Sequence, residues 1–200
     1  MFIIDFLKRL ASYCYKRDVL FVYYCDVEQT LRQAPPMLTD LTTYACDRDN
    51  YAQVKAVLKP FPPVIGPRIE RGELAFIAAQ GNQWIFRASV IPGPREYQVA
   101  GYPLHLQAQD AYMECAETIP VWRGKGVAPG MLRLTMQTLL DRGCTRSFVT
   151  IAITNTSSCR AIEKGGGQRI GLITGRRLFG RWRSMYIPLT HDAQFSSIAC

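Results

Sequence analysis

Two hydrophobic patterns alternate along this chain, and together they predict a mixed α+β fold. Short, dense runs of apolar, β-branched and aromatic residues are typical of strands. Apolar residues that recur every three or four positions are typical of helices, and they do so at residues 51–58 and 128–140. The predicted strands are residues 19–25, 74–79, 84–90, 110–121, 148–153, 169–174 and 181–189.

Glycine and polar residues mark the places where these elements should end. Gly81-Asn82 separates two predicted strands and favours an antiparallel hairpin. Gly143 follows the long helix and can take the left-handed conformation that ends it. Glycines 165–167 end a second helix that begins near Asn155, and we expect the last two strands to turn at Arg176-Arg177.

The N-terminal segment, residues 1–17, predicts an amphipathic helix. Phe2, Phe6 and Leu10 recur every four residues, and basic residues lie beside them. An early Asp5 and the lack of a small-residue cleavage site make a signal peptide a poor interpretation. Packing of this helix on the domain is favoured over binding at a membrane surface.

The length of 200 residues has room for one domain with short extensions. We assign residues 18–189 to that domain and residues 190–200 to a C-terminal tail. Hydrophobic residues make up 48% of the chain and charged residues 20%, which excludes a disordered or coiled-coil protein. No apolar run approaches the roughly 18 residues of a membrane span, so none is expected.

Between residues 110 and 164 the predicted order is strand, helix, strand, helix. Such a succession implies two parallel strands joined by a right-handed crossover. The second of these strands, residues 148–153, is almost continuously apolar, which is typical of a strand buried on both faces.

The net charge and the cysteine content limit the class of ligand and the cellular compartment that we expect. The 24 basic and 16 acidic residues give a net charge of +8, which favours anionic ligands without choosing among them. The seven cysteines are odd in number and form no C-x-x-C pair. We therefore expect a reducing, cytoplasmic compartment and no metal site.

The clearest chemical signal lies at residues 118–128, where a strand runs through Arg123-Gly124-Lys125-Gly126 into a helix. The start of a helix presents unpaired N–H groups and positive potential, which suits a phosphate. Glycines let a diphosphate approach the backbone closely, and the two basic side chains add charge.

Two common phosphate motifs do not fit this loop. The P-loop pattern G-x-x-x-x-G-K-[ST] is absent from the chain. The glycine spacing also misses G-x-G-x-x-G, and no acidic residue follows about 20 positions later. Nucleoside triphosphate and dinucleotide ligands are therefore disfavoured.

The segment Arg123-Gly-Lys-Gly-Val-Ala128 resembles the pyrophosphate loop [QR]-x-x-G-x-[GA] of the GNAT superfamily, the acyl-CoA-dependent N-acyltransferases. The helix led by Asn155 resembles the second motif of that family, and the resemblance covers residues 110–175 closely. It implies a GNAT-like α+β fold. In that fold a central mixed, mostly antiparallel sheet is flanked by helices, and its parallel fourth and fifth strands splay apart.

The resemblance also implies where acetyl-CoA or another acyl-CoA would bind. The pantetheine arm lies between the splayed strands in this family, so the main chain around Ile119 and Val121 would hold it. Asn155 and Ser158 would face the cofactor from the next helix, although Asn155 is equally suited to be an ordinary helix N-cap. The residues expected to bind the diphosphate are Arg123, Gly124, Lys125, Gly126, Val127 and Ala128.

Attack on a thioester requires a neutral amine, so a base should lie near the fourth strand. Glu117 is the first candidate, Glu114 the second and Asp110 the third. Because side chains alternate along a strand, Glu114 and Glu117 are expected on opposite faces. Each also has a structural interpretation as a solvated or ion-paired residue.

The acid that often protonates the departing thiolate in this family is a tyrosine seven positions after the asparagine. Here that position is Ile162. A thiol of pKa near ~8.5 can leave without full protonation, so catalysis is still compatible with the sequence. Ser158, Cys159 and Tyr186 are substitutes that the sequence does not distinguish.

The leading hypothesis is an N-acyltransferase that transfers an acetyl or longer acyl group from acyl-CoA to a primary amine by direct attack in a ternary complex. The alternative is a catalytically silent acyl-CoA-binding module, favoured by Ile162. A homodimer is compatible with the sequence. Specific nucleic-acid binding is disfavoured because no recognition motif accompanies the C-terminal arginines. These arginines are Arg169, Arg176, Arg177, Arg181 and Arg183.

Overall fold

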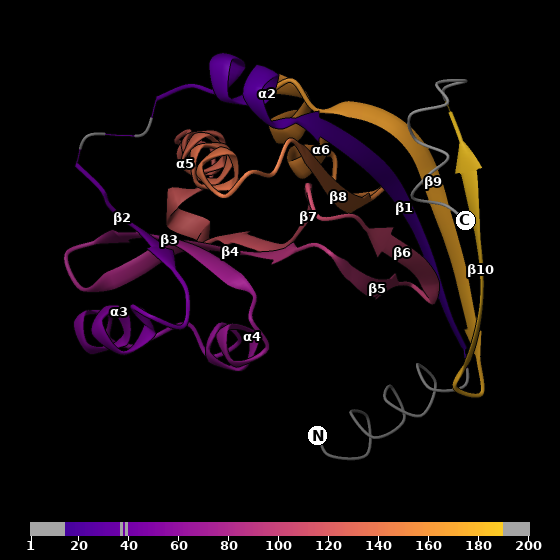
Figure 1. The fold of residues 1–200 in the computed structure, drawn as a ribbon, viewed down its shortest axis with the longest axis horizontal. Coiled ribbons are helices and arrows are strands. Elements are labelled where there is room, and N and C mark those ends of the chain that lie inside the picture. The colour runs from indigo at the N-terminus through magenta and orange to yellow at the C-terminus, as the bar shows by residue number, and fades with distance from the viewer. Residues whose placement is uncertain (1–14, 37, 39, 190–200) are drawn as a thin grey trace.

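The computed structural model describes residues 15–36, 38 and 40–189, which form a large sheet with helices on both faces (Figure 1). The helices are α2 (Val27–Gln33), α3 (Tyr51–Val57), α4 (Gly66–Glu70), the 3-10 turn η1 (Pro120–Trp122), α5 (Val127–Asp141) and α6 (Thr156–Lys164). The strands are β1 (Tyr15–Asp26), β2 (Thr42–Cys46), β3 (Leu74–Gln80), β4 (Gln83–Pro92), β5 (Arg95–Val99), β6 (Tyr102–Leu106), β7 (Asp110–Thr118), β8 (Arg146–Ala152), β9 (Gln168–Leu178) and β10 (Arg181–Pro188).

The main sheet has the order β10-β9-β1-β8-β7-β4-β3-β2, and β5 pairs only with β6. Every neighbouring pair is antiparallel except β7 and β8. The predicted α+β class, with a mostly antiparallel sheet and one parallel pair, is confirmed. Within the described part of the chain, no helix is long and apolar enough to cross a membrane.

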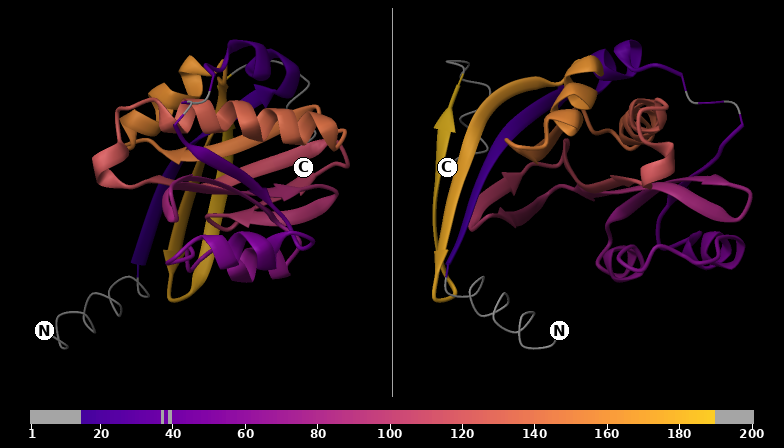
Figure 2. Two further views of the ribbon diagram at one scale, coloured as in Figure 1. Left: turned by 90° about the vertical axis from the view of Figure 1, so that its left-hand side faces the viewer. Right: turned by 180° about the vertical axis from the view of Figure 1, so that it is seen from behind.

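Alternation along β3 builds two cores on opposite faces of the sheet. Phe76 and Ala78 belong to the cluster that includes the apolar side of α5. Ala75 and Ile77 belong to the cluster formed with α3 and α4. Figure 2 shows α5 and the pair α3 and α4 on the two sides of this part of the sheet. We call these sides the α5 face and the α4 face.

The parallel pair is short, and this shapes the site. Residues 110–113 of β7 pair with residues 146–149 of β8, and the pairing stops there. The connection through α5 supplies the predicted crossover, and Gly143 ends that helix with a φ of 79°. Beyond Met113 and Val149 the two strands diverge, so a gap opens toward their C-terminal ends.

A β-bulge interrupts β7 just where the strands diverge. Ser89 of β4 pairs with Glu114, and Arg87, two residues earlier, pairs with Glu117 three residues later. The extra residue on β7 coincides with Cys115, whose φ is 55°. The bulge therefore shifts the alternation of side chains along the second half of β7.

The first described strand lies inside the sheet. β1 pairs with β8 on one side and with β9 on the other, so β10 forms the edge. The β5–β6 hairpin packs against β1 and β9 through an apolar cluster that contains Val99, Leu104 and Ile173. Figure 1 shows this hairpin beside the long β1, β9 and β10 strands.

Three predicted boundaries differ from the structure. The strand expected at 110–121 ends at Thr118, because Pro120 begins a 3-10 turn. Arg176 and Arg177 lie inside β9, and the turn falls at Phe179-Gly180, where both residues have positive φ. β1 already begins at Tyr15, and the rest of the expected 1–17 helix lies outside the described residues.

The hydrophobic pattern does not predict the short helices and strands, because each contains too few residues to show a period. Helices α2 and α4 span seven and five residues, which is under two helical turns. Strands β2, β5 and β6 have five residues each and mix polar with apolar side chains. Their positions depend on pairing and packing with distant segments.

The closed end of the parallel pair depends on a buried ion pair, and we expect its loss to destabilise the fold. Asp110 is fully buried, and Arg146 donates to both of its carboxylate oxygens at 2.7 and 3.1 Å. Replacing Asp110 by Ala leaves the guanidinium uncompensated and should lower the free energy of unfolding by about 3–5 kcal/mol. Urea denaturation measures this. Asp49→Ala at an exposed site is the control, and equal losses for both variants would contradict the assignment.

Candidate active site

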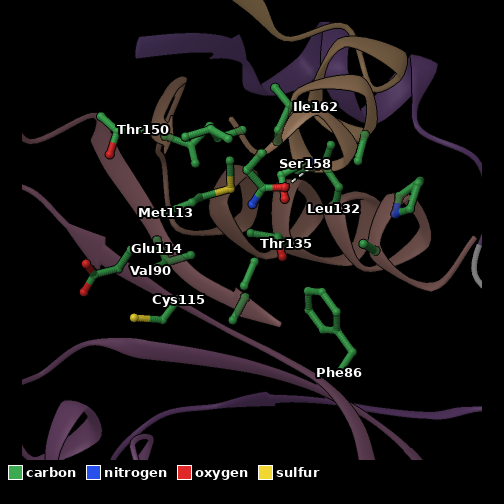
Figure 3. A pocket seen from close by; sticks show the side chains of 18 of the residues that line it. Phe86, Val90, Met113, Glu114, Cys115, Leu132, Thr135, Thr150, Ser158 and Ile162 are labelled. Atoms are coloured by element: carbon green, nitrogen blue, oxygen red, sulfur yellow. Dashed lines mark hydrogen bonds between the residues drawn. The ribbon is translucent and has the colours of Figure 1, made fainter. Parts of the chain in front are cut away.

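A cleft of about 250 Å³ fills the gap where β7 and β8 diverge (Figure 3). Leu132 and Thr135 of α5 form one wall and Ile162 of α6 another. The lining is mainly apolar and includes Phe86, Val90 and Met113 from the α5 face of the sheet. The cleft therefore suits a slender, largely apolar group.

A second cavity of about 520 Å³ continues from the cleft to the loop before α5. Ala128, Asn155 and Ser158 line both cavities, so the two form one continuous site. The second cavity is the more polar end, with Arg123, Arg160 and Lys164 in its wall.

The loop between η1 and α5 presents a row of backbone donors. Gly124 and Gly126 have φ values of 75° and 81°, a conformation that favours glycine. A Cβ added at either glycine would meet no described protein atom within 4 Å and would project into open space. Within the described residues, the N–H groups of 124–128 make no backbone hydrogen bond. This is a donor cradle of the kind that binds phosphate groups.

Cationic side chains surround this cradle from two elements. Arg160 and Lys164 lie four residues apart on α6 and so share one helix face. Arg123 is held by a 3.0 Å hydrogen bond that its Nε donates to the carbonyl of Thr118. Lys125 does not line the cavity, and its ammonium lies 4.6 Å from the ring centroid of Trp122. Sequence reasoning missed Arg160 and Lys164, although their four-residue spacing was a usable signal.

The two ends of the site differ in chemical character, and their residues could hold the two ends of an acyl-CoA molecule. The donor cradle and the cationic side chains fit a diphosphate, and the apolar cleft fits a pantetheine arm with its acyl group. Among the described residues, no group of His, Cys, Asp and Glu is arranged to hold a metal ion.

The strand segment beside the cleft is earlier in the chain than the sequence predicts. The Ile119 N–H donates to the Ile85 carbonyl at 2.9 Å, so it faces β4. Val121 lies in η1 and is 70% exposed. Neither residue lines the two cavities, and the part of β7 that does is Met113–Ala116, with Glu117 and Thr118 in the second cavity.

Asn155 serves as the N-cap of α6 and also faces the site. Its Oδ1 accepts hydrogen bonds from the Ser158 N–H at 3.2 Å and from the Ser157 hydroxyl at 3.0 Å. The carboxamide nitrogen of Asn155 makes no hydrogen bond to any residue that the structure describes. Both interpretations given for Asn155 are thus compatible with its geometry.

The bulge at Cys115 brings both candidate carboxylates to the same face, which corrects the expectation of opposite faces. Glu114 and Glu117 pair with Ser89 and Arg87, and these two alternate positions of β4 both point to the α4 face. Figure 3 shows Glu114 on the side of β7 away from Ile162 and Leu132. Only Glu114 lines the apolar cleft, whereas Glu117 lines the polar cavity.

Arginines neutralise both carboxylates. Arg68 of α4 donates to Oε1 of Glu114, and the Tyr97 hydroxyl donates to Oε2 at 2.7 Å. Arg87 donates to Glu117 at 3.0 and 2.5 Å. The third candidate, Asp110, is consumed by its ion pair with Arg146 and lies at the closed end of the strand pair.

Two tyrosines connect Glu114 to β8 on the α4 face of the sheet. Burial and the Glu114 carboxylate raise the pKa of Tyr97, and burial raises the pKa of Tyr112. The rings lie 5.2 Å apart, and the Tyr112 hydroxyl is hydrogen bonded to Thr150 Oγ1 at 2.6 Å. Both phenols are therefore protonated near neutral pH, and Tyr97 donates its proton to Glu114.

The remaining candidates for an acid are less well placed. Ile162 lies in the cleft wall, so the position of the family's usual tyrosine faces the site but carries no proton. Tyr186 donates to the Ile170 carbonyl at 3.2 Å in the β5–β6 contact region, and Cys159 is buried. Partial burial raises the pKa of the Cys115 thiol at the bulge of β7, which disfavours a thiolate nucleophile there.

Comparison with solved structures identifies the fold. A GCN5-related N-acetyltransferase-like protein from Streptococcus suis matches with a TM-score of 0.56 and 15% identity over 90% of this chain and 67% of that one. A putative GNAT acetyltransferase from Novosphingobium aromaticivorans matches with a TM-score of 0.54 and 15% identity over 88% of this chain and 66% of that one. A GNAT acetyltransferase from Colwellia psychrerythraea matches with a TM-score of 0.53 and 14% identity over 88% and 57%.

The chain therefore has the fold of the GNAT superfamily. It spans about two thirds or less of the length of these solved proteins. No protein-family model and no curated protein sequence matches it.

Two arginines bind the carboxylate of Glu73 next to Glu114, and we expect them to contribute unequally to the stability of the fold. Glu73 is 3% exposed and is bound by Arg68 at 2.7 Å and by Arg71 at 2.9 Å. Arg68→Met strips a buried partner from both Glu73 and Glu114 and should cost about 3 kcal/mol of unfolding free energy. Arg71→Met removes a largely exposed partner and should cost less than about 1 kcal/mol. Chemical denaturation of both variants tests this, and equal costs would show that the cluster is not the stabilising feature.

Proposed function

We propose that this protein is an acyl-CoA-dependent N-acyltransferase, most simply an N-acetyltransferase, that acts on a primary amine by direct attack in a ternary complex. The observation that carries the proposal is the apolar cleft between diverging parallel strands, continuous with a row of unpaired N–H groups at the start of α5. The fold shared with GNAT acetyltransferases supports it.

Each part of acyl-CoA has a counterpart in the site. The N–H groups of residues 124–128 would bind the diphosphate, assisted by Arg123, Arg160 and Lys164. The edge of β7 from residue 114 to residue 118 would hold the pantetheine arm in place of the expected Ile119 and Val121. Asn155 and Ser158 would contact the arm from α6. When bound, acyl-CoA supplies an activated thioester carbonyl.

Glu114 is the better candidate for the base. An alkyl ammonium with a pKa near ~10.4 must lose a proton before its nitrogen can attack. Glu114 lines the apolar cleft and points to the α4 face, opposite the α5 face that carries α5 and α6. An amine that reaches the cleft from the α4 face would meet this carboxylate. Glu117 lies beside the diphosphate cradle, too close to the polar end for the same task.

Tyr97 would orient the Glu114 carboxylate. Its hydroxyl donates to Glu114, and the ring lies against Tyr112, which reaches Thr150 on the other strand. Tyr97 and Tyr112 line neither cavity, so they would act only through Glu114 and Thr150 and would not replace the acid that is missing at Ile162. A thiolate with a thiol pKa near ~8.5 can also leave with little assistance.

The second candidate function is a silent acyl-CoA-binding module. Two observations favour it: Ile162 occupies the cleft wall, and arginines neutralise Glu114 and Glu117. Such a module would bind acyl-CoA without accelerating transfer. We place the protein in the cytoplasm in both cases, a proposal supported by the five described cysteines, all of which are free thiols.

Binding of acetyl-CoA should stabilise the wild type and fail in one glycine variant. At ligand a hundredfold above its dissociation constant, the gain is about 2.7 kcal/mol, visible as a rise in melting temperature. Gly126→Glu places bulk and negative charge inside the donor cradle and should abolish the rise. Gly81→Glu is the control, because Gly81 also has a positive φ and open space but lies in the β3–β4 turn. If acetyl-CoA raised the melting temperature of Gly126→Glu as much as that of the wild type, the assignment of the diphosphate site would be wrong.

The cations of α6 should contribute to affinity and not to folding. Arg160→Ala combined with Lys164→Ala should weaken acetyl-CoA binding roughly tenfold or more, since each removes a charge-assisted contact with phosphate. Isothermal titration calorimetry measures the dissociation constant, and Lys55→Ala on the exposed side of α3 is the control. An unchanged dissociation constant in the double variant would exclude this wall from the phosphate site.

Turnover separates the enzyme from the silent module. Glu114→Gln should lower the rate of CoA release about 10²- to 10⁴-fold, leave acyl-CoA binding unchanged, and affect the rate more than Glu117→Gln. The wild-type rate should rise with pH as the amine loses its proton. A CoA-release assay over a panel of amines, with melting curves to verify folding, measures these effects. No release above hydrolysis in the wild type, despite acyl-CoA binding, would establish the module instead.

A further inference from the structure

The outer end of the sheet carries a row of arginines that nothing in the described chain neutralises. Arg17, Arg176 and Arg183 are direct cross-strand partners on β1, β9 and β10. Paired residues of neighbouring strands share a face and lie about 5 Å apart, so three positive charges occupy one row. All three side chains are exposed, and within the described residues none makes an ion pair or a hydrogen bond.

Like charges directly opposite each other on a sheet destabilise it. The arrangement is expected where an anionic partner compensates the repulsion. A hollow of about 380 Å³ lies over this row and is lined by Arg17, Arg176 and Arg183 together with Thr174 and Met185. Arginine side chains and a threonine hydroxyl around one hollow are donors suited to phosphate oxygens.

Large apolar side chains surround the row and extend to the tip of the hairpin. Leu178 and Phe179 at the β9–β10 turn are 55% and 67% exposed, and Met185 on the other side of the row is 56% exposed. Tyr15, the register partner of Leu178, is 54% exposed. The surface thus combines cations with aliphatic and aromatic side chains, which suits the interface of a lipid bilayer.

The same features fit nucleic acid poorly. Leu178 and Met185 offer no hydrogen bond to a phosphate backbone and no ring for stacking on bases, and the exposed aromatic side chains, Tyr15 and Phe179, lie at the tip of the hairpin and not within the arginine row. The tryptophan of this hairpin, Trp182, is on the other face of the sheet, packed close to Gly101 and flanked by Lys16 and Arg177. It is therefore unavailable for stacking beside the arginine row.

The N-terminal residues 1–14 precede the fold at this tip. Residue 14 leads directly into Tyr15, beside the β9–β10 turn. The sequence of residues 1–14 contains Phe2, Ile3, Ile4, Phe6, Leu7 and Leu10 with Lys8 and Arg9. Apolar and basic residues thus adjoin the exposed tip in the covalent chain as well as in the sheet.

We propose that the β9–β10 tip and the row of Arg17, Arg176 and Arg183 form a docking site for an anionic lipid bilayer. The guanidinium groups bind lipid phosphates and carboxylates, and Leu178 and Phe179 enter the headgroup region. The site is separate from the acyl-CoA site, because its residues line neither of the two connected cavities.

Vesicle co-sedimentation of the full chain tests the proposal. The probes are vesicles of phosphatidylcholine alone and vesicles in which phosphatidylserine or phosphatidylglycerol replaces part of it. Binding is expected only to the anionic vesicles and should weaken as salt is raised. The triple variant R17Q/R176Q/R183Q should reduce the partition coefficient roughly a hundredfold, about fivefold for each arginine.

The control R32Q/K55Q/K59Q removes the same charge from exposed positions on α2, on α3 and just after α3, and it should have a much smaller effect. The variant L178S/F179S should reduce the binding that persists at high salt. Melting curves and acetyl-CoA binding verify that each variant is folded.

Three results would overturn the proposal. Equal losses in the two triple variants would show an effect of net charge alone. Tighter binding to duplex DNA or RNA than to anionic vesicles would make the row a nucleic-acid surface. Loss of vesicle binding in F2S/F6S but not in R17Q/R176Q/R183Q would place membrane binding in the N-terminal segment and not at the hairpin, and no vesicle binding by the wild type would exclude it altogether.

Discussion

The divergence of β7 and β8 is the constraint on which the rest of the site depends. Two parallel strands in one sheet normally continue pairing, because unpaired backbone groups in a protein interior are costly. Here the pairing ends at Met113 and Val149, and the bulge at Cys115 redirects β7 toward β4. The Asp110–Arg146 ion pair secures the closed end, and α5 and α6 wall the open end. A cleft and an exposed strand edge are the consequence.

Charge compensation decides what the carboxylates near the cleft can do. Asp110, Glu73, Glu114 and Glu117 are all paired with arginines, so the sheet carries these acids without isolated buried charges. The pairs are not equivalent, because Asp110 and Glu73 are enclosed whereas Glu114 borders the cleft. An ion pair at that border orients the Glu114 carboxylate, and it also occupies the oxygens that would accept a proton.

The placement of β1 explains the exposed end of the molecule. Because β1 lies between β8 and β9, β10 becomes the edge, and the β9–β10 hairpin projects past the end of β8. The β5–β6 hairpin covers one side of this projection and leaves the other side with its arginines and apolar side chains uncovered. The strand order that completes the sheet therefore also creates an exposed, cationic surface, whereas the cleft is mainly apolar.

The sequence by itself determined the elements whose information is local. The long helix α5, the β3–β4 hairpin, the strand β8 and the glycine loop were all predictable, because hydrophobic period, turn residues and helix-start chemistry act over a few neighbouring residues. Only the tertiary structure decided which face Glu114 and Glu117 share, because one inserted residue at Cys115 reverses the alternation and leaves no local pattern. It also decided that Ile119 and Val121 leave the strand edge, and that Arg17 joins Arg176 and Arg183, which are distant from it in sequence, in one row. Strand register is a long-range property set by pairing across the sheet, so these features could not be predicted from neighbouring residues alone.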